Sequence, residues 1–277
     1  IRRQRQMCIR DSTHISEEGF AYFGTIGGID PRVTAGKRVL LGDKRLPGVI
    51  AAKAIHMQKP EERGVPAPIE EMFIDIGALS EENTKSLVSV GDCAVFAPNF
   101  ETFGDGFIKS KAIDDRFGCA LLVRLLQSDL EYDAYFAFCT AEEVGCRGAM
   151  TVAQAVGADT DVVLEATTAG DIPGAPKSRV ACRVGGGAVV SFMDGGTIYP
   201  RGLVDAVMRL AEEKGIRAQL KELVAGGNDA SAYQRAAAGA RVLALSAPVR
   251  YIHSACSVAK YDDLEQVFAR KPVRDRR

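Results

Sequence analysis

The sequence predicts an α/β fold with two parts, a smaller β-rich part followed by a larger part in which strands alternate with helices. The chain has 277 residues, which exceeds the roughly 100–200 residues of a usual single domain. Before about Asp105, strand-length apolar segments are separated by glycine, proline and aspartate, as in small β-barrels or sandwiches. After about Gly106, such segments alternate with longer helical patterns, which indicates a sheet covered by helices.

The composition is that of an ordinary folded protein. Hydrophobic residues make up 47% of the chain, charged residues make up 26%, and the formal net charge is −1. This balance gives no attraction to nucleic acids or membranes, and apolar runs such as 120–126 are far shorter than the ~20 residues that cross a bilayer. We therefore expect a cytoplasmic protein that binds neither nucleic acids nor membranes. The seven cysteines are odd in number and scattered, which is typical of reduced core thiols.

We expect residues 13–105 to form a β-barrel-like domain. One helix is predicted within it, because Ser80 can act as the N-cap and Gly91 ends the helical pattern. Short apolar segments bounded by turn residues predict its strands, at 19–26, 38–41, 49–54, 73–76 and 93–97.

Residues 106–277 are expected to form the larger α/β domain. Longer segments with a helical period predict its helices, and Pro200 suits the first turn of one of them. The predicted helices are 116–127, 147–156, 200–214 and 231–238, and the predicted strands are 134–140, 161–166, 188–193 and 241–246.

Acidic residues and one histidine lie at the ends of predicted elements in the larger domain, where open α/β sheets place their ligand sites. Asp114 precedes a helix, Glu142 and Glu143 follow a strand, Glu165 closes another strand, and His253 follows the last one. Carboxylates with an imidazole supply the mixed oxygen and nitrogen ligands that suit zinc, cobalt or manganese. The pattern therefore predicts a divalent-metal site.

A site with two metal ions needs one carboxylate that reaches both ions, which lie about 3.5–4 Å apart. Asp114 is our candidate for this bridge. If the backbone at Glu142 and Glu143 is extended, their side chains point in opposite directions and do not share one ion. One glutamate then binds a metal, while the other acts as a general base on water.

Each of these residues also has a structural interpretation. Taken alone, the pair Glu142–Glu143 beside a glycine is typical of a solvated loop, and a single histidine such as His253 is typical of a hydrogen-bonded structural residue. Four further residues are predicted to be structural or surface groups: His14 and His56, Asp115 as a helix-start acid, and Asp171 as a turn residue.

Taken together and in order, several motifs resemble the glutamyl, deblocking and tetrahedral aminopeptidases of metallopeptidase family 42. The resemblance runs from Thr13 to about Asp263. Each motif is weak alone, but the ordered set is specific. Beside the Asp114 and Glu142–Glu143 motifs, it includes Thr13–Phe20, Thr25–Gly28, Ile74–Ala78, Gly226–Ala230 and Tyr251–Ser254.

The resemblance implies a Zn-peptidase-type mixed sheet flanked by helices, with a smaller dimerisation-type β-barrel domain. It also implies two divalent metal ions. By the family's pattern, Asp114 bridges both ions, Glu142 is the general base, Glu143 and His253 complete one ion, and Glu165 binds the other. The family often has aspartate at the position of Glu165, and a glutamate there keeps an oxygen ligand while altering the geometry.

The family's remaining ligand is a histidine in a His-x-Asp motif that precedes the segment beginning here at Thr13. No histidine precedes His14. We therefore expect the chain to be a fragment that lacks this motif, with Ile1–Ser12 not belonging to the native protein and with activity in doubt.

The resemblance implies hydrolysis of N-terminal residues from peptides with a free N-terminus, by a homo-oligomer built from dimers and as large as a dodecamer. Two other functions fit parts of the sequence. Paired carboxylates also serve metal-independent glycosidases, whose acids lie roughly 5–9.5 Å apart. A non-catalytic peptide-binding or assembly protein fits the absent His-x-Asp motif.

Overall fold

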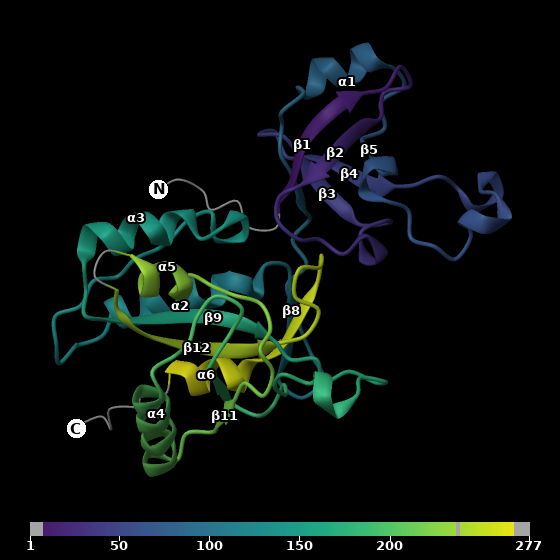
Figure 1. Cartoon of the computed structure of the whole chain (residues 1–277). Helices are drawn as coiled ribbons and strands as arrows, with labels where there is room; N and C mark the ends of the chain where they lie inside the picture. The colour runs from purple at the N-terminus through teal and green to yellow at the C-terminus, as the bar shows by residue number, and fades with distance from the viewer. Residues whose placement is uncertain (1–7, 237–238, 269–277) are drawn as a thin grey trace, which may run out of the picture. The chain divides into compact units, whose positions relative to one another are not determined.

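The computed structural model describes residues 8–236 and 239–268 of the chain (Figure 1). The chain divides into two compact units. The first contains residues 1–99, 110–112 and 253–256, and the second contains residues 100–109, 113–252 and 257–277.

The first unit is built around a closed barrel with the strand order β1-β2-β5-β4-β3-β6. Every pairing that involves β3 or β4 is antiparallel. Short helices lie in the connections: the 3-10 helices η1 (Pro31–Val33), η2 (Ile55–Met57), η3 (Pro60–Glu62) and η4 (Ile69–Glu71), and α1 (Glu81–Leu87). The strands are β1 (Cys8–Ile15), β2 (Ala21–Thr25), β3 (Arg38–Leu41), β4 (Leu46–Ala51), β5 (Phe73–Asp75) and β6 (Ala94–Phe96).

The barrel interior is filled by alternate residues of its strands. In β3, Val39 and Leu41 are fully buried whereas Arg38 is exposed, as expected when successive side chains point to opposite faces. Phe96 and Ile50 are buried in the same core. This alternation explains why the strands 38–41, 73–76 and 93–97 are predicted well by the sequence.

Strand β1 begins at Cys8, inside the segment that we expected to be non-native. Its backbone pairs with β2, where Ile9 lies opposite Thr25, and with β6, where Cys8 lies opposite Val95. The hydrogen bonds between strands join main-chain groups, so segments of very different side-chain composition can pair in this position.

The second unit contains a mixed four-stranded sheet with the order β11-β10-β12-β9. The two long strands, β9 (Thr160–Thr168) and β12 (Arg241–Val249), run parallel over nine residue pairs. β10 (Ala188–Val190) is antiparallel to β12 and parallel to β11 (Ala218–Leu220). The expected mixed α/β fold is therefore confirmed. A separate three-stranded sheet consists of β7 (Glu101–Phe103), β8 (Phe107–Ser110) and β13 (Ser257–Lys260).

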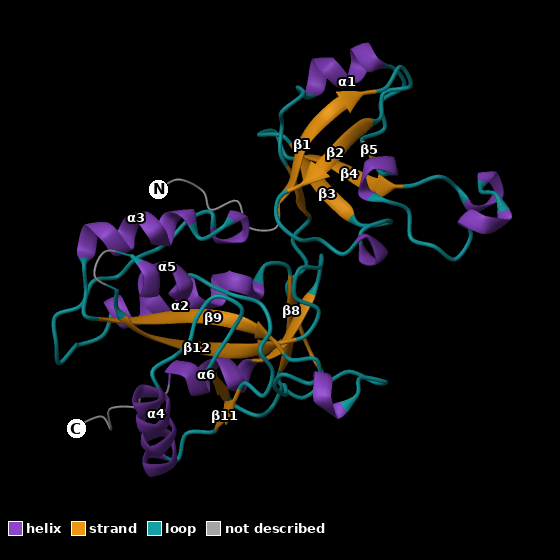
Figure 2. Cartoon of the chain, in the orientation of Figure 1, coloured by secondary structure: helices purple, strands orange, loops and turns teal. Residues whose placement is uncertain are grey.

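Helices cover both faces of the four-stranded sheet (Figure 2). On one side of β9 and β12 lie α2, α3 and α5, and on the other side lie α4 and α6. These helices are α2 (Ile113–Leu126), α3 (Arg147–Val156), α4 (Arg201–Lys214), α5 (Ala230–Arg235) and α6 (Tyr261–Phe268).

The predicted strand at 134–140 is wrong, because these residues form no strand in the structure. Its alternating apolar residues fit a strand, but a strand needs a neighbour that satisfies its main-chain groups. No described strand pairs with it, and Tyr135 is 82% exposed. The sequence analysis also missed β1, β7, β8, β11, β13 and α6, whereas the helices predicted at 116–127, 147–156 and 200–214 are confirmed.

Among the described residues, no helix is both long and apolar enough to cross a bilayer.

Helix α2 packs closely against β9 at Gly118. A Cβ atom at this position would lie 2.5 Å from the carbonyl oxygen of Leu164 and would overlap the carboxylate of Asp115. Only glycine allows this approach, which brings the beginning of α2 next to the middle of β9.

We predict that Gly118→Ala lowers the free energy of unfolding by about 1–3 kcal/mol. The added methyl group overpacks the contact and forces the neighbouring backbone to shift. The measurement is urea unfolding followed by circular dichroism. Gly202→Ala in α4 is the matched control, because no atom lies within 4 Å of its added Cβ, and alanine is the better helix former by up to about 1 kcal/mol. Equal losses in both variants would contradict the tight α2–β9 contact.

Candidate metal centre and catalytic loop

The first site element is the beginning of α2, where Asp114 and Asp115 have non-helical backbone angles. The peptide bond that joins them is cis. The Asp115 Oδ1 atom accepts a hydrogen bond of 2.8 Å from the Gly118 N–H. Asp115 therefore caps the regular part of the helix, as predicted for a helix-start acid.

Asp115 also belongs to a carboxylate cluster, which the sequence analysis did not predict. Asp114, Asp115 and Glu165 each offer an oxygen within 4.8 Å of the others. Glu165 points from β9 and is only 7% exposed. The close contact at Gly118 explains the cluster, because it places the α2 acids against β9.

This cluster is electrostatically unfavourable without a cation. Burial raises the pKa of Glu165 well above its usual value, and the neighbouring charges of Asp115 and Asp114 raise it further. Burial likewise raises the pKa of Asp115, with smaller contributions from Asp114 and Glu142. A bound divalent cation would reverse this preference and stabilise the ionised carboxylates. The oxygen donors therefore fit a divalent metal ion.

The second site element is the tight loop that carries Glu142 and Glu143. The short 3-10 helix η5 (Glu142–Val144) begins after Ala141, whose backbone is left-handed at φ 61°. The Glu142 carbonyl accepts hydrogen bonds from Gly145 (2.9 Å) and Cys146 (3.0 Å). The loop is therefore held by its own main chain.

The loop is closed at its base by Gly148, whose N–H donates to the Thr140 carbonyl at 2.9 Å. A Cβ atom at Gly148 would lie 2.5 Å from Thr140 main-chain atoms. Because η5 is a 3-10 turn and not extended backbone, Glu142 and Glu143 are separated by about 120° around its axis. The extended backbone on which we based the division between the two side chains is therefore not present.

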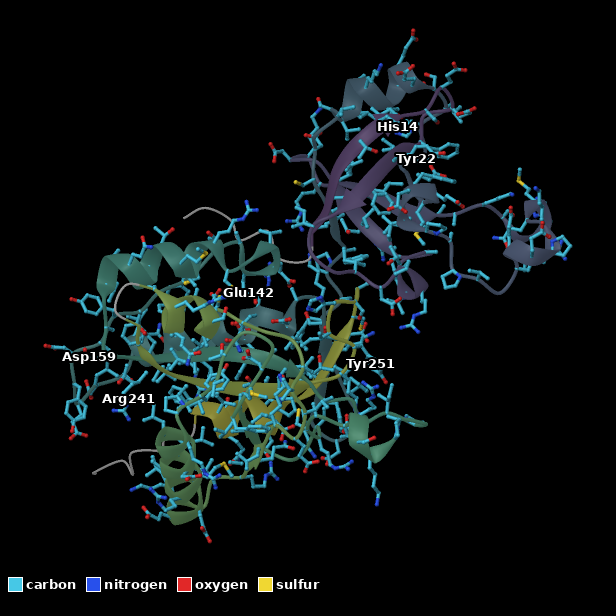
Figure 3. The ribbon with its side chains drawn as sticks, in the orientation of Figure 1. His14, Tyr22, Glu142, Asp159, Arg241 and Tyr251 are labelled. Carbon is cyan, nitrogen blue, oxygen red and sulfur yellow. The ribbon has the colours of Figure 1, made fainter. Side chains whose placement is uncertain are left out.

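The two glutamates of the loop have different surroundings. A Glu143 carboxylate oxygen lies within 4.8 Å of one from Asp114. Glu142, labelled in Figure 3, has its pKa raised to about 8, first by burial and then by the charges of Glu143, Asp114 and Asp229. A carboxyl group with a pKa near neutrality can both accept and return a proton.

His253 belongs to the first unit, where its Nδ1 atom lies 2.9 Å from the Gly28 carbonyl oxygen. A carbonyl oxygen only accepts, so Nδ1 carries the hydrogen and donates it. This hydrogen bond fixes the tautomer in which Nε2 keeps its lone pair, as in histidines that bind metals.

The other two histidines also belong to the first unit. The His14 ring stacks on Tyr22 with centroids 4.3 Å apart (Figure 3). His56 is exposed in η2. Neither belongs to a metal-capable cluster among the described residues.

Asp171 has the structural role that we predicted, although as an ion-pair partner and not only as a turn residue. Its two carboxylate oxygens accept hydrogen bonds from the Arg250 guanidinium, both at 2.8 Å. It also accepts from the Val184 N–H at 3.1 Å. Burial opposes ionisation of Asp171, but the contacts with Arg250 and Val184 prevail and the net effect is a lowered pKa.

Asp229 lies close enough to the acidic groups for its charge to act on them, although it was not among our candidates. It lies directly before α5, is 8% exposed, and burial raises its pKa. Its Oδ1 atom has no hydrogen-bond partner within the described part of the chain. Its charge raises the pKa of Glu142, Glu165 and Asp115. Asp229 lies in the motif Gly226–Ala230, where an acidic residue directly before a helix is also typical of a helix cap.

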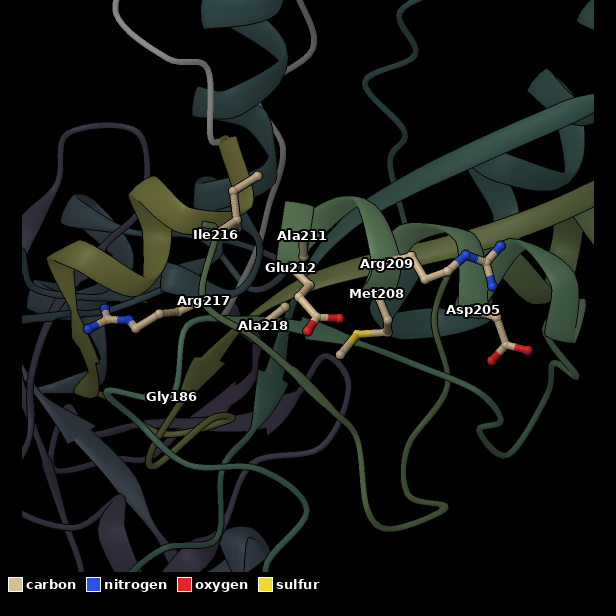
Figure 4. A pocket seen from close by; sticks show the side chains of 9 residues that line it. All are labelled: Gly186, Asp205, Met208, Arg209, Ala211, Glu212, Ile216, Arg217 and Ala218. Atoms are coloured by element: carbon tan, nitrogen blue, oxygen red, sulfur yellow. The ribbon is translucent and has the colours of Figure 1, made fainter. Parts of the chain in front are cut away.

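A shallow cavity of about 640 Å³ lies elsewhere in the second unit, beside α4 (Figure 4). Its lining includes Met208, Glu212 and Arg217. None of the predicted site residues lines it, so it is separate from the carboxylate cluster.

The fold and the carboxylate cluster define an α/β protein whose acidic residues can form a metal site. Residues 12–269 match the family model described as M42 glutamyl aminopeptidase. The chain therefore belongs to the M42 glutamyl aminopeptidase family, as the resemblance indicated, and is a hydrolase of the peptidase class.

Individual relatives agree with this assignment. Aminopeptidase FrvX of Escherichia coli K12 is 34% identical over 265 residues, which cover 92% of this chain and 74% of that protein. A TET aminopeptidase from a marine sediment archaeon of the Thaumarchaeota has a similar structure, with a TM-score of 0.89 and 33% identity over 94% of this chain and 76% of its own. The TET1 peptidase of Pyrococcus horikoshii, which can assemble into a tetrahedron or a large octahedral shell, gives a TM-score of 0.82 and 31% identity over 96% of this chain and 79% of its own.

The Asp171–Arg250 ion pair predicts a pH-dependent loss of stability. The pKa of Asp171 is lower in the folded state than in the unfolded state. Its contribution to the free energy of unfolding is therefore complete above the unfolded pKa of about 3.9 and disappears as the pH falls through the folded pKa. We expect Asp171→Asn to lower the free energy of unfolding by about 1–3 kcal/mol at pH 7, with a difference from wild type that narrows towards pH 3.

Melting temperatures measured between pH 7 and pH 3 test this prediction. Asp105→Asn is the control, because Asp105 pairs with Lys260 but is 96% exposed, and such surface pairs contribute little. A difference between wild type and Asp171→Asn that stays constant down to pH 3 would contradict the assigned ion pair.

Proposed function

We propose that this protein is a metal-dependent aminopeptidase with two divalent metal ions and a glutamate general base. The observation that carries the proposal is the position of Asp114. A carboxylate oxygen of Asp114 lies within 4.8 Å of one from Glu143. In a second group of possible ligands, a carboxylate oxygen of Asp114 lies within 4.8 Å of oxygens from Asp115 and Glu165. A residue shared by two groups of ligands is what a bridging carboxylate requires.

In the proposed centre, Asp114 would be shared by the two ions and Glu165 would hold the first. Glu143 and His253 would hold the second. The hydrogen bond from His253 Nδ1 to Gly28 supports this role, because metal-binding histidines usually donate their other ring N–H. This mixed oxygen and nitrogen set suits zinc, cobalt or manganese.

When bound, the metals supply the polarisation of the scissile carbonyl and lower the pKa of water. Glu142 takes the proton from the attacking water on its carboxylate and passes it to the leaving amine. The position of Glu142 supports this role, because it is partly buried and stands next to the proposed ligand Glu143 in η5. Asp115 orients the beginning of α2 through its bond to Gly118 and so helps to hold Asp114 in place.

We further propose peptides with a free N-terminus as substrates and a homo-oligomer as the active form. Support comes from the family match and from the assemblies formed by the Pyrococcus horikoshii relative. In this proposal, residues 13–105 form the oligomerisation domain and residues 106–277 form the catalytic domain. The six-stranded barrel of the first unit supports the assignment.

We predict that each chain retains about one zinc ion after zinc loading and desalting. Retention of this ion should require His253. The chain has only three histidines, His14, His56 and His253, and His253 is the one that we place in the centre. Elemental analysis should show a loss of this ion in His253→Ala and no loss in His56→Ala, which removes an exposed imidazole.

Other stoichiometries would change the assignment. Two ions retained by wild type would mean that the carboxylates alone complete the first ion's site. No bound ion in a folded chain would contradict the metal centre. Glycan hydrolysis that continues after the metal ions are chelated would favour a glycosidase. Metal-independent peptide binding without turnover would favour a non-catalytic binding protein.

Glu142→Gln should lower kcat for an aminoacyl substrate by about 10²–10⁴-fold, the usual contribution of a general base. Bound zinc should stay equal to that of wild type, since the amide replaces a group that we do not place on the metal. Glu143→Gln is the matched comparison and should lose both activity and zinc. Equal zinc loss in the two variants would contradict the division of roles in the loop.

A further inference from the structure

The barrel unit includes two short segments that come from later parts of the sequence. Residues 110–112 and 253–256 both belong to this first unit. The earlier segment leads into α2, where Asp114 follows Ala112 by two residues. The later segment begins with His253 and is called the His253 loop below. Each segment therefore carries or directly precedes a residue that we place in the metal centre.

One side chain joins these two segments. The Asn99 Nδ2 atom donates a hydrogen bond of 2.9 Å to the Ala255 carbonyl oxygen. The Asn99 Oδ1 atom accepts a hydrogen bond of 2.8 Å from the Lys111 N–H. Because a carbonyl oxygen only accepts and a main-chain N–H only donates, a single orientation of the amide satisfies both bonds. Asn99 thus fixes how the His253 loop lies relative to the segment before Asp114.

The two segments also pack in the core of the barrel. Ala112 is 2% exposed and Ala255 is 6% exposed, and both belong to the cluster that contains Phe96 and Ile50. Apolar contacts are not directional, so they hold the segments against the barrel without fixing the direction of either main chain. Two hydrogen bonds to one planar amide are directional. Asn99 therefore adds the restraint that packing alone does not give.

The main chain of both segments has a conformation that needs such a restraint. Ala112 has φ 54° and His253 has φ 59°, which is the left-handed region. Residues other than glycine rarely adopt this conformation, and it persists only where the surrounding structure determines it. Lys111 directly precedes Ala112, and Ala255 lies two residues after His253. The two Asn99 bonds therefore act next to the unusual backbone in both segments.

The His253 ring has a separate anchor on the barrel. Its Nδ1 atom donates to the Gly28 carbonyl oxygen at 2.9 Å. This bond sets the direction of the imidazole, whereas the bond from Asn99 to Ala255 sets the position of the main chain that carries it. Partners that orient a metal ligand in this way contribute strongly to metal affinity.

We propose that Asn99 is a positioning residue of the metal centre, which holds the His253 loop in register with the segment that leads into Asp114. The inference rests on the proposed ligand roles of Asp114 and His253. Asn99 itself touches neither a metal ion nor the substrate in this proposal. The barrel unit then has a second task beside the proposed oligomerisation, because one of its side chains sets the spacing of two ligands.

The first test is hydrogen–deuterium exchange of the metal-free protein, followed by mass spectrometry. Asn99→Asp keeps an acceptor for the Lys111 N–H but has no donor for the Ala255 carbonyl, whereas Asn99→Ala removes both groups. Exchange in residues 251–257 should therefore rise by about fivefold or more in both variants. Exchange in the peptide that contains Lys111 should rise in Asn99→Ala and stay close to wild type in Asn99→Asp.

Two controls separate a local release from a loss of the barrel fold. Exchange in β3 and β4 of the same barrel should be unchanged in both Asn99 variants. Asn83→Asp introduces the same charge at an exposed position in α1. It should leave exchange in residues 251–257 at the wild-type rate.

The second test is zinc affinity, measured by competition with a chelator of known affinity. Asn99→Asp and Asn99→Ala should weaken binding of the His253-dependent ion by about 10-fold or more, the usual effect of removing a group that orients a metal ligand. Asn83→Asp should bind zinc as tightly as wild type.

Three results would overturn the positioning role: wild-type exchange in residues 251–257 of Asn99→Asp, wild-type zinc affinity in a folded Asn99→Ala, or exchange that rises equally in β3 and β4. If Asn99→Asp does not fold, Asn99→Ala decides. If the wild-type chain binds no zinc, the proposed metal centre fails, whereas the exchange rates still test whether Asn99 joins the two segments.

Discussion

The contact between α2 and β9 at Gly118 is the constraint on which the carboxylate cluster depends. Removing the side chain at one position lets the helix approach the Leu164 carbonyl. The same approach brings Asp114 and Asp115, at the beginning of the helix, beside Glu165 on the strand. Burial and the neighbouring charges oppose the ionisation of Glu165 and Asp115, so the packing of α2 on β9 holds together groups that would repel one another when charged.

The main chain holds the second element in a similar way. The Glu142 carbonyl closes its own turn by accepting two N–H groups, and Gly148 seals the base of the loop. These hydrogen bonds join main-chain groups only and do not involve the carboxylates of Glu142 and Glu143. The closed shape of the loop therefore does not depend on the charge of these two side chains.

The sequence predicted elements whose signal is local and failed where the signal is not. The helix at 147–156 and the strand at 38–41 follow from periodicity, and both are confirmed. Residues 134–140 have the alternation of a strand, but pairing decides whether a strand forms, and pairing cannot be derived from one segment. The short strands β7 and β13 lack a long apolar run and depend on each other through β8.

The same distinction applies to the site. Asp114 and Glu143 were found because each stands in a recognisable motif, and the structure brings their carboxylates together. Asp115 was predicted only as a helix-start acid, because capping is visible in sequence whereas the approach of β9 is not. Asp229 was not predicted for a related reason, since a local motif cannot show that a residue is buried near the acidic groups of other elements.

Glu165 differs from the residue that the motif pattern leads one to expect. Aspartate is common at its position in the family that the sequence resembles, and glutamate extends the carboxylate by one methylene. Such an extension requires space or a compensating partner. Here Glu165 stays buried on β9, yet its oxygen still lies within 4.8 Å of both α2 acids. The longer side chain therefore reaches the two α2 acids from the strand while it stays buried.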